Sequence, residues 1–336
     1  MRLQDVNYLR AYAIISIVVW HCFVCPLSVW GIIEPTLYTK IVSTIGKFFI
    51  PDANMPLFTF VSGYLFAYLY QKNKEKYGNF KSFFRTKFER LVIPFLVLGT
   101  LVNITVPERE LSMIINGEGS HLWFCMMLFW CFMIRWAILK VNLKPLNLTM
   151  LFLSIATILY SRGNNWNLPD FPFSILGIRH AVFFYAYFVM GDLLYKNKEK
   201  LLDIVKRGGA FLWILSIVYS LWVIGSFLNI SIFSGLLRIS TSVFFIVLIF
   251  LWIIRLVDKG YLKPNKYVDT LCTYSFGIYV FHEWLSWGLY HQPFFLNLFE
   301  QYTLVYAAIF TIVDFAVSFI LTHYALKTQV GKYLLL

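Results

Sequence analysis

Charged residues are scarce in this chain. Only 14% of its 336 residues are Asp, Glu, Lys or Arg, whereas about a quarter of the residues of a soluble globular protein are charged. Hydrophobic residues make up 59% of the chain and aromatic residues 20%, and the mean hydropathy is +0.68. Water could not cover so much apolar surface. The composition therefore excludes an ordinary soluble protein and predicts that the hydrocarbon core of a bilayer is the solvent.

Several chemical signatures are also missing. The sequence shows no metal-ligand spacing, no glycine-rich nucleotide loop and no serine-hydrolase elbow, so we expect neither a bound metal nor a tightly bound cofactor. All five cysteines fall in or beside apolar segments. Cys22 and Cys25 have redox spacing, but inside an apolar helix we interpret them as small packing residues.

Long runs without charge dominate instead. A membrane-spanning helix needs roughly 20 mostly apolar residues. The run 11–33 contains no charged residue, and the run 208–237 is long enough for parts of two helices. We predict one all-α membrane domain over residues 1–336. Its ten predicted transmembrane helices lie near 8–30, 48–70, 90–106, 121–140, 145–160, 177–195, 209–228, 236–257, 270–290 and 302–326.

Basic residues fix the predicted orientation, because Lys and Arg accumulate on the cytoplasmic side. With the amino terminus inside, the outer side holds only six of the 29 basic residues, which leaves 23 for the inner side. The six are Lys40, Lys47, Arg109, Arg162, Arg179 and Arg238. We therefore predict a multi-pass protein of the cell (inner or plasma) membrane with both ends in the cytoplasm. The net charge of +12 then reflects topology and attraction to anionic lipid. The basic residues are scattered, which argues against a nucleic-acid partner.

Ionisable groups inside a membrane span are costly and are functional candidates. Arg10 and His21 are eleven residues apart, which is about three helical turns and ~16 Å on nearly the same face. We expect Arg10 at the cytoplasmic mouth and His21 near the bilayer midplane. The alternatives are a structural hydrogen-bonded histidine and an arginine that only anchors the helix at the interface.

Two further motifs follow along the chain. Ser62-Gly63 lies mid-span, where small residues let two helix backbones approach closely, so we favour packing over catalysis for Ser62. Lys87 and Arg90 begin the next span. They are three residues apart and share a predicted helix face, which would suit a phosphate group. Interfacial anchoring is the alternative.

Near the carboxyl end, His282 and Glu283 are adjacent in a predicted helix. Neighbouring residues point in different directions, so we expect that they cannot both face one pocket and that one marks the outer end of the span. Asp314 lies inside the last predicted helix and needs a partner. Arg179 or Arg238 could pair with Asp170, Glu283 or Asp314; the pairing stays open at this point.

Five stretches, in order from residue 5 to 282, resemble the motifs of the integral-membrane acyltransferase-3 family. They are Asp5-Val6-Asn7-Tyr8-Leu9-Arg10 followed by His21, Pro56-Leu57-Phe58 with Ser62-Gly63-Tyr64-Leu65, Lys87-x-x-Arg90-Leu91-x-x-Pro94, His121-Leu122-Trp123-Phe124, and Ser275-x-Gly277-Ile278-Tyr279-x-x-His282. The chain departs from the pattern in two places, with Ala11 where glycine is usual and Lys87 where arginine is usual.

The resemblance implies transfer of an acyl group, usually acetyl from acetyl-coenzyme A, to a sugar hydroxyl of a surface glycan or lipid-linked saccharide. Arg10, Lys87 and Arg90 would then hold coenzyme A phosphates. His21 would be the general base or would carry the acetyl group covalently. The alternatives are a polysaccharide exporter in which His21, Glu283 and Asp314 line a path, and an inactive scaffold.

Overall fold

The structure is a computed structural model that describes residues 4–24, 36–39, 41–42, 53–105, 112–117, 120–141, 144–163, 175–227 and 234–335. Within these residues every regular element is a helix, which confirms the predicted all-α class. The helices are α1 (Gln4–Phe23), α4 (Asn54–Lys72), α5 (Lys74–Gly78), α6 (Phe80–Lys87), η1 (Phe88–Val92), α7 (Ile93–Thr105), α8 (Ser112–Ile115), η2 (Ser120–Leu122), α9 (Trp123–Val141), α10 (Lys144–Gly163), η3 (Ile175–Gly177), α11 (Ile178–Lys196), α12 (Lys198–Arg207), α13 (Gly209–Phe227), α14 (Ser234–Asp258), α15 (Lys266–Tyr290), α16 (Pro293–Ala325) and α17 (Gln329–Leu335).

Each of the ten predicted segments contains a helix. Among the described residues, five helices are long and apolar enough to cross a membrane, and a bent pair, α12 with α13, could make a sixth. The five are Gln4–Phe23, Phe80–Thr105, Trp123–Val141, Thr241–Asp258 and Pro293–Ala325. The protein is therefore of the all-α membrane type, while the number of ten crossings and their orientation stay predictions.

Two predicted helices begin earlier than expected. The third helix, expected from residue 90, is continuous from Phe80, because its charged first turns interrupt the apolar pattern without interrupting the helix. Asn79 caps this start by accepting a hydrogen bond from the Ser82 backbone N–H, at 3.2 Å. The first helix begins at Gln4 and ends at Phe23. His21 lies in the last turn of α1, and residues 25–30 of the predicted span 8–30 fall outside the described residues.

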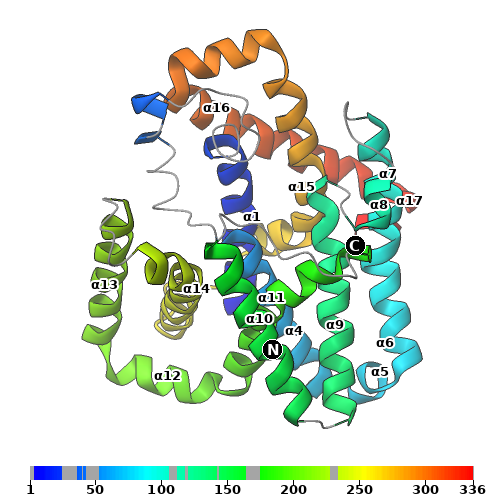
Figure 1. Cartoon of the computed structure of the whole chain (residues 1–336), viewed down its shortest axis with the longest axis vertical. Coiled ribbons are helices and arrows are strands. Elements are labelled where there is room, and N and C mark those ends of the chain that lie inside the picture. The colour runs from blue at the N-terminus through cyan, green and yellow to red at the C-terminus, as the bar shows by residue number, and fades with distance from the viewer. Residues whose placement is uncertain are drawn as a thin grey trace. The chain divides into compact units, whose positions relative to one another are not determined.

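The helices form two compact units, one from the described parts of 1–54 and 263–336, the other from those of 55–262. The first unit is built on α1, α15 and α16, each in contact with the other two (Figure 1). Asn7 contacts Asp269 near the start of α15, and Cys22 contacts Tyr290 at its end. These contacts show that α1 and α15 run parallel, so their first turns lie at the same end of the unit.

Glycines bring α4 and α11 together in the second unit. A Cβ on Gly63 would lie 1.9 Å from the Phe188 carbonyl oxygen, and one on Gly191 would lie 2.0 Å from the Phe60 carbonyl oxygen. No side chain fits at either position. The close approach predicted for Ser62-Gly63 is thus confirmed at Gly63, and Ser62 beside it is half-buried.

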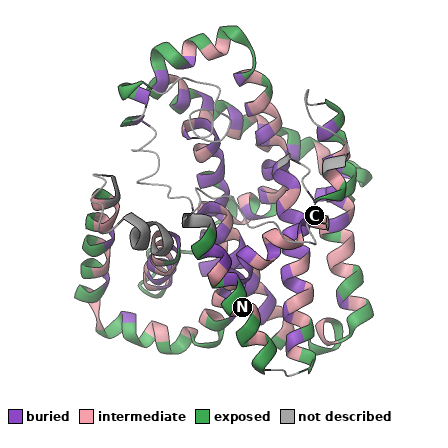
Figure 2. Ribbon diagram, viewed as in Figure 1, coloured by how far each residue is buried: buried purple, intermediate pink, exposed green. Residues whose placement is uncertain are grey.

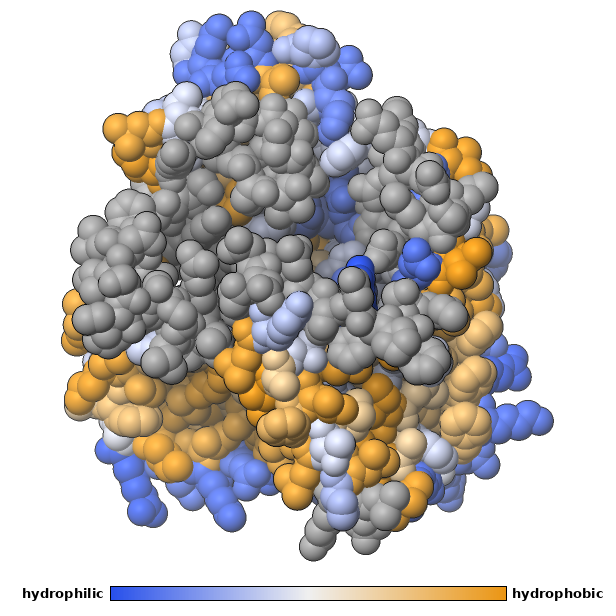
Figure 3. Space-filling view, in the orientation of Figure 1, coloured by the Kyte–Doolittle hydropathy of each residue, from blue (hydrophilic) through white to orange (hydrophobic). Residues whose placement is uncertain are grey.

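The bend between α12 and α13 separates charged from apolar surface. The two helices meet at 95°, and Arg255 supports the bend by donating a hydrogen bond from Nη1 to the Val205 carbonyl oxygen, at 3.2 Å. Figure 2 shows many exposed residues along α12 and α13. In Figure 3 apolar side chains gather where Figure 1 places α13, with hydrophilic ones below them at α12. A helix that leaves the hydrocarbon layer at a bend requires this division.

Candidate functional site

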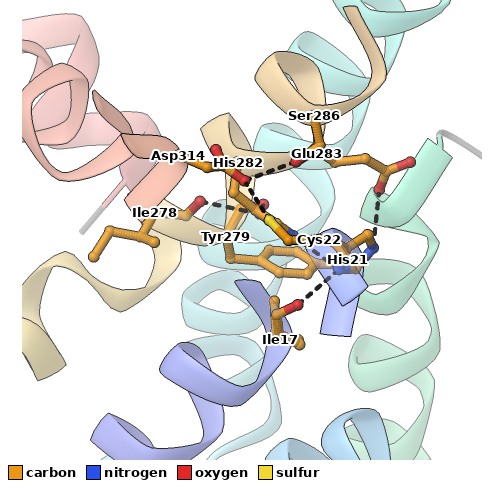
Figure 4. A network of polar contacts seen from close by, with 9 residues as sticks. All are labelled: Ile17, His21, Cys22, Ile278, Tyr279, His282, Glu283, Ser286 and Asp314. Carbon is orange, nitrogen blue, oxygen red and sulfur yellow. Dashed lines mark hydrogen bonds and ion pairs between the residues drawn. The ribbon is translucent and has the colours of Figure 1, made fainter. Parts of the chain in front are cut away.

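His21 lies at the centre of a buried polar network formed by α1, α15 and α16 (Figure 4). Its Nδ1 is 2.9 Å from the backbone carbonyl oxygen of Ile17 and 3.3 Å from Nε2 of His282. Its Nε2 is 3.9 Å from Oε2 of Glu283. The two imidazole rings meet edge to face, with centroids 4.7 Å apart. Both His21 nitrogens therefore face groups that can accept or hold a proton.

Backbone carbonyls determine the tautomers of the two histidines. A carbonyl oxygen only accepts hydrogen bonds, so Nδ1 of neutral His21 carries the proton that faces Ile17. Nδ1 of His282 lies 3.1 and 2.8 Å from the carbonyl oxygens of Ile278 and Tyr279, and by the same argument it also carries a proton. His282 Nε2, at the longer distance of 3.3 Å, can then share this one N–H with the Ile17 carbonyl as a second acceptor. In this tautomer the basic lone pair of His21 is on Nε2, the nitrogen that faces Glu283.

The expectation that His282 and Glu283 cannot serve one site is wrong. Both side chains are buried and both approach the same imidazole, one at each nitrogen. The two side chains do point in different directions, but the His21 ring lies between them. His282 contacts one of its nitrogens and Glu283 approaches the other. His282 is 0% exposed, whereas His21 and Glu283 are 7% and 6% exposed. All three side chains are therefore buried, and His282, at the Nδ1 edge of the His21 ring, is the most completely buried of them.

Arg10, three turns before His21 on α1, also contacts α15. Its Nη2 donates to the carbonyl oxygen of Cys272, at 2.9 Å, and to Oγ of Ser275, at 3.0 Å. Arg10 and His21 thus both face α15, as their eleven-residue spacing predicted. Within the described residues Arg10 makes no ion pair, so its Nε and Nη1 groups remain as donors for an anionic ligand.

The motif around Ser275 has a contact for each of its polar or small members. Ser275 accepts a hydrogen bond from Arg10, and His282 contacts His21. Gly277 lies against Thr322 of α16, where a Cβ would be 2.3 Å from the Thr322 methyl carbon. The motif therefore encodes the packing of α15 between α1 and α16.

Asp314 extends the network into α16. It is 0% exposed and accepts hydrogen bonds from Ser286 at 2.7 Å, Ser318 at 3.3 Å and the thiol of Cys22 at 3.8 Å. Among the described residues no cationic side chain contacts Asp314. Its described partners are hydroxyl and thiol groups, which join all three helices at one carboxyl group. The side chain of Arg238, one of the arginines suggested by the sequence, lies outside the described residues.

Lys87 and Arg90 belong to the second unit. The Lys87 ammonium lies over the ring of Phe132, 3.6 Å from its centroid, and Arg90 is exposed on η1. Both approach Tyr77: Lys87 Nζ is 6.0 Å from its ring centroid. Burial raises the pKa of Tyr77, and the positive charge of Arg90 opposes that rise. Phosphate binding by this pair stays a prediction.

The remaining sequence candidates lie elsewhere. Arg179 is the second residue of α11, also in the second unit, and is half-buried. Asp170 and the side chain of Arg238 fall outside the described residues, as does Cys25. The four described cysteines are free thiols, and no group of metal-ligating side chains occurs in the described part of the chain.

Two polar clusters escaped the sequence reasoning. Ser286 donates a hydrogen bond to Asp314. It lies four residues after His282 on the same helical face, and this spacing would have indicated Ser286 as a site candidate. Arg135 of α9 forms a buried ion pair with Asp192 of α11, which also binds Lys196 at 2.9 Å. The signal was present here as well, because Arg135 and Asp192 are ionisable residues inside predicted spans.

Comparison with known proteins connects this geometry to a family. A family model described as an acyltransferase domain matches residues 3–323, a range that includes the whole second unit, most of the first and every residue of the His21 network. In the same comparisons no curated protein and no solved structure matches the chain. Because the family match covers nearly the whole sequence and the helices are of the membrane type, the chain belongs to the acyltransferase-3 family of membrane acyltransferases.

Proposed function

We propose that the protein transfers an acetyl group from acetyl-coenzyme A to a hydroxyl group of a cell-surface polysaccharide or lipid-linked saccharide. The observation that carries the proposal is the setting of His21. Its Nδ1 is held by a backbone carbonyl and by His282, and its Nε2 faces Glu283. A neutral imidazole with a fixed tautomer and an adjacent carboxylate is suited to take a proton from a weak nucleophile such as a sugar hydroxyl.

The donor would extend along α1. Arg10 keeps Nε and Nη1 for a phosphate while Nη2 holds α15, and Ser275 and Cys272 fix the guanidinium in place. Eleven residues separate Arg10 from His21, a distance of about 16 Å along a helix, comparable to an extended pantetheine arm. An acetyl-coenzyme A whose phosphates bind Arg10 would thus bring its thioester to His21.

The transfer step follows from the assigned lone pair. His21 Nε2 accepts the proton of the sugar hydroxyl as its oxygen attacks the thioester carbon. The resulting imidazolium faces Glu283 at 3.9 Å, and opposite charges at about 4 Å attract by roughly 4 kcal/mol at an effective dielectric constant of 20. Collapse of the tetrahedral intermediate breaks the C–S bond. The coenzyme A thiolate then takes the proton from Nε2, which restores neutral His21.

A covalent route would use the same nitrogen. Nε2 would attack the thioester carbon, release coenzyme A, and pass the acetyl group to the sugar hydroxyl in a second step. Rapid quenching of the protein with acetyl-coenzyme A alone, followed by peptide mass analysis, separates the two routes. Acetylated His21 in the absence of acceptor would establish the covalent route.

The test of the function is acetyl transfer by purified protein in detergent. Radiolabelled acetyl-coenzyme A is incubated with surface glycans from cells that lack the gene, and label on the glycan is measured. Mass analysis of glycans from cells with and without the gene should show one acetyl group missing from the latter. A protein that neither transfers nor hydrolyses acetyl-coenzyme A, yet whose loss stops glycan export, would be a transporter and would refute the proposal.

A further inference from the structure

Lys87 occupies an aromatic site, although the sequence placed it at a phosphate. Its ammonium is 3.6 Å from the centroid of Phe132 and 6.0 Å from the centroids of both Tyr77 and Phe83. A cation over an aromatic face is attracted by the ring quadrupole, and most strongly where water is excluded. Phe132 and Phe83 are buried, and Lys87 is half-buried. The ammonium therefore already has a partner without a phosphate.

Arg90, three residues later, has the opposite setting. It is exposed, and among the described residues it makes no ion pair or hydrogen bond. The neighbouring acid Glu89 is bound to Arg85 at 2.8 Å and so does not neutralise Arg90. Of these two basic residues, Arg90 is the one whose guanidinium is available to an anion, and its planar group suits a phosphate.

A π-helical segment, η1, joins the two residues. The backbone N–H of Ile93 donates to the Phe88 carbonyl oxygen, five residues earlier, instead of four as in an α-helix. Pro94 follows and has no N–H to donate. Such wide turns are rare and are frequent at functional sites. Lys87 is the residue immediately before η1, so a contact that fixes Lys87 also fixes the point at which the wide turn begins.

The contact of Lys87 with Phe132 ties the start of η1 to α9, against which η1 packs. We propose that Lys87 is a positioning residue: its cation–π contact with Phe132 fixes η1 and thereby presents Arg90 to a phosphate of coenzyme A. The inference rests on the proposed function for the identity of the ligand. It also gives Lys87 a role distinct from that of a second phosphate ligand.

Fluorination of one ring tests the proposal without changing its shape. Trifluorinated phenylalanine is incorporated at position 132 of the full-length protein, and binding of coenzyme A is measured by calorimetry in detergent. Fluorine withdraws charge from the ring face, so the Kd should rise about three- to tenfold if the desolvated contact is largely lost. Phe129 provides the matched control: it is buried on the same helix and packs edge to face on Phe84, so its fluorination should leave the Kd unchanged.

Two substitutions complete the design. Lys87→Met should raise the Kd as much as fluorination of Phe132 does, and the two changes combined should cost no more than either alone, because both remove one contact. Arg90→Gln should raise the Kd about tenfold or more, as loss of a charge-assisted hydrogen bond does. A tenfold loss in Lys87→Met with no effect of fluorinating Phe132 would make Lys87 a phosphate ligand and overturn the proposal.

A second readout is independent of the ligand. Hydrogen exchange of the amides of residues 88–92 should accelerate when Phe132 is fluorinated and not when Phe129 is. Unchanged exchange at 88–92 would overturn the positioning role even if coenzyme A binds. Conversely, faster exchange in a protein that does not bind coenzyme A would support the positioning role and refute the proposed donor.

Discussion

The two units bury charge in different ways. In the second unit Arg135 binds Asp192, which also binds Lys196, while Asn147 accepts a hydrogen bond from Arg135. In the first unit His21 and Glu283 are 3.9 Å apart, too far for a hydrogen bond. A closed ion pair holds helices together and is costly to break. A buried histidine with a carboxylate at this distance keeps the capacity to exchange protons. We therefore infer that the Arg135–Asp192 ion pair stabilises the second unit and that His21 and Glu283 serve the chemistry.

The largest effect should come from His21→Ala. Loss of a general base typically lowers the turnover number by ~10²–10⁴-fold, and the KM for acetyl-coenzyme A should change little. Steady-state acetyl transfer by the purified variant measures both parameters.

His291→Ala is the matched control, because His291 is an exposed histidine at the end of α15. His282 cannot serve as that control, since it contacts His21. Near-normal turnover in well-folded His21→Ala would refute the mechanism. A variant that fails to fold would show that His21 is structural.

Asp192→Ala should produce the largest loss of stability. It leaves buried Arg135 without its carboxylate, and breaking a buried ion pair costs about 3–5 kcal/mol. Thermal unfolding in detergent measures the loss, while turnover per folded molecule should stay near that of the wild type.

The double replacement Arg135→Met with Asp192→Leu separates charge from packing. It removes both charges and should recover most of the lost stability. If turnover falls in Asp192→Ala as steeply as in His21→Ala while stability is unchanged, the contrast between the two units is mistaken.

Glu283→Gln should lower turnover by about ten- to a hundredfold. The carboxylate stabilises the imidazolium by no more than roughly 4 kcal/mol, and each 1.4 kcal/mol corresponds to a factor of ten in rate. The amide keeps the size of the side chain, so stability and the KM for acetyl-coenzyme A should be retained. Unchanged turnover would show that Glu283 only fills space beside His21.

Much of this architecture could be predicted from periodicity and charge, and some of it could not. The eleven-residue spacing placed Arg10 and His21 on one face, and both do contact α15. The convergence of His282 and Glu283 was missed because it depends on where the His21 ring enters, which is a tertiary contact. The early start of the third helix was missed because hydropathy detects membrane spans, whereas Asn79 and the helix backbone decide where the helix begins.

Arg10→Ala should raise the KM for acetyl-coenzyme A about tenfold, because a charge-assisted hydrogen bond contributes roughly 1.5–3 kcal/mol. The KM for the glycan should not change comparably. Arg10→Lys keeps the charge but not the forked geometry that reaches Cys272 and Ser275 together, so it should recover only part of the affinity. If a well-inserted Arg10→Ala protein keeps the wild-type affinity for acetyl-coenzyme A, Arg10 only anchors the helix at the membrane interface.

The smallest effect should come from Asp314→Asn. Asp314 is bound by two hydroxyls and a thiol, and an amide can satisfy the same partners, since its oxygen accepts from Ser286 and its NH₂ donates to the hydroxyl of Ser318. Turnover should stay within about threefold of wild type, because one altered neutral hydrogen bond is worth only about 0.5–1.5 kcal/mol.

Asp314→Ala should instead destabilise the protein by about 1–3 kcal/mol, because it leaves buried hydroxyls without an acceptor. Thermal unfolding and acetyl transfer of the two variants together show whether Asp314 stabilises the first unit or takes part in its chemistry. If Asp314→Asn abolishes transfer, the negative charge of Asp314 takes part in the chemistry with that of Glu283. If only Asp314→Ala is impaired, Asp314 joins the three helices and the chemistry is confined to the His21–Glu283 edge.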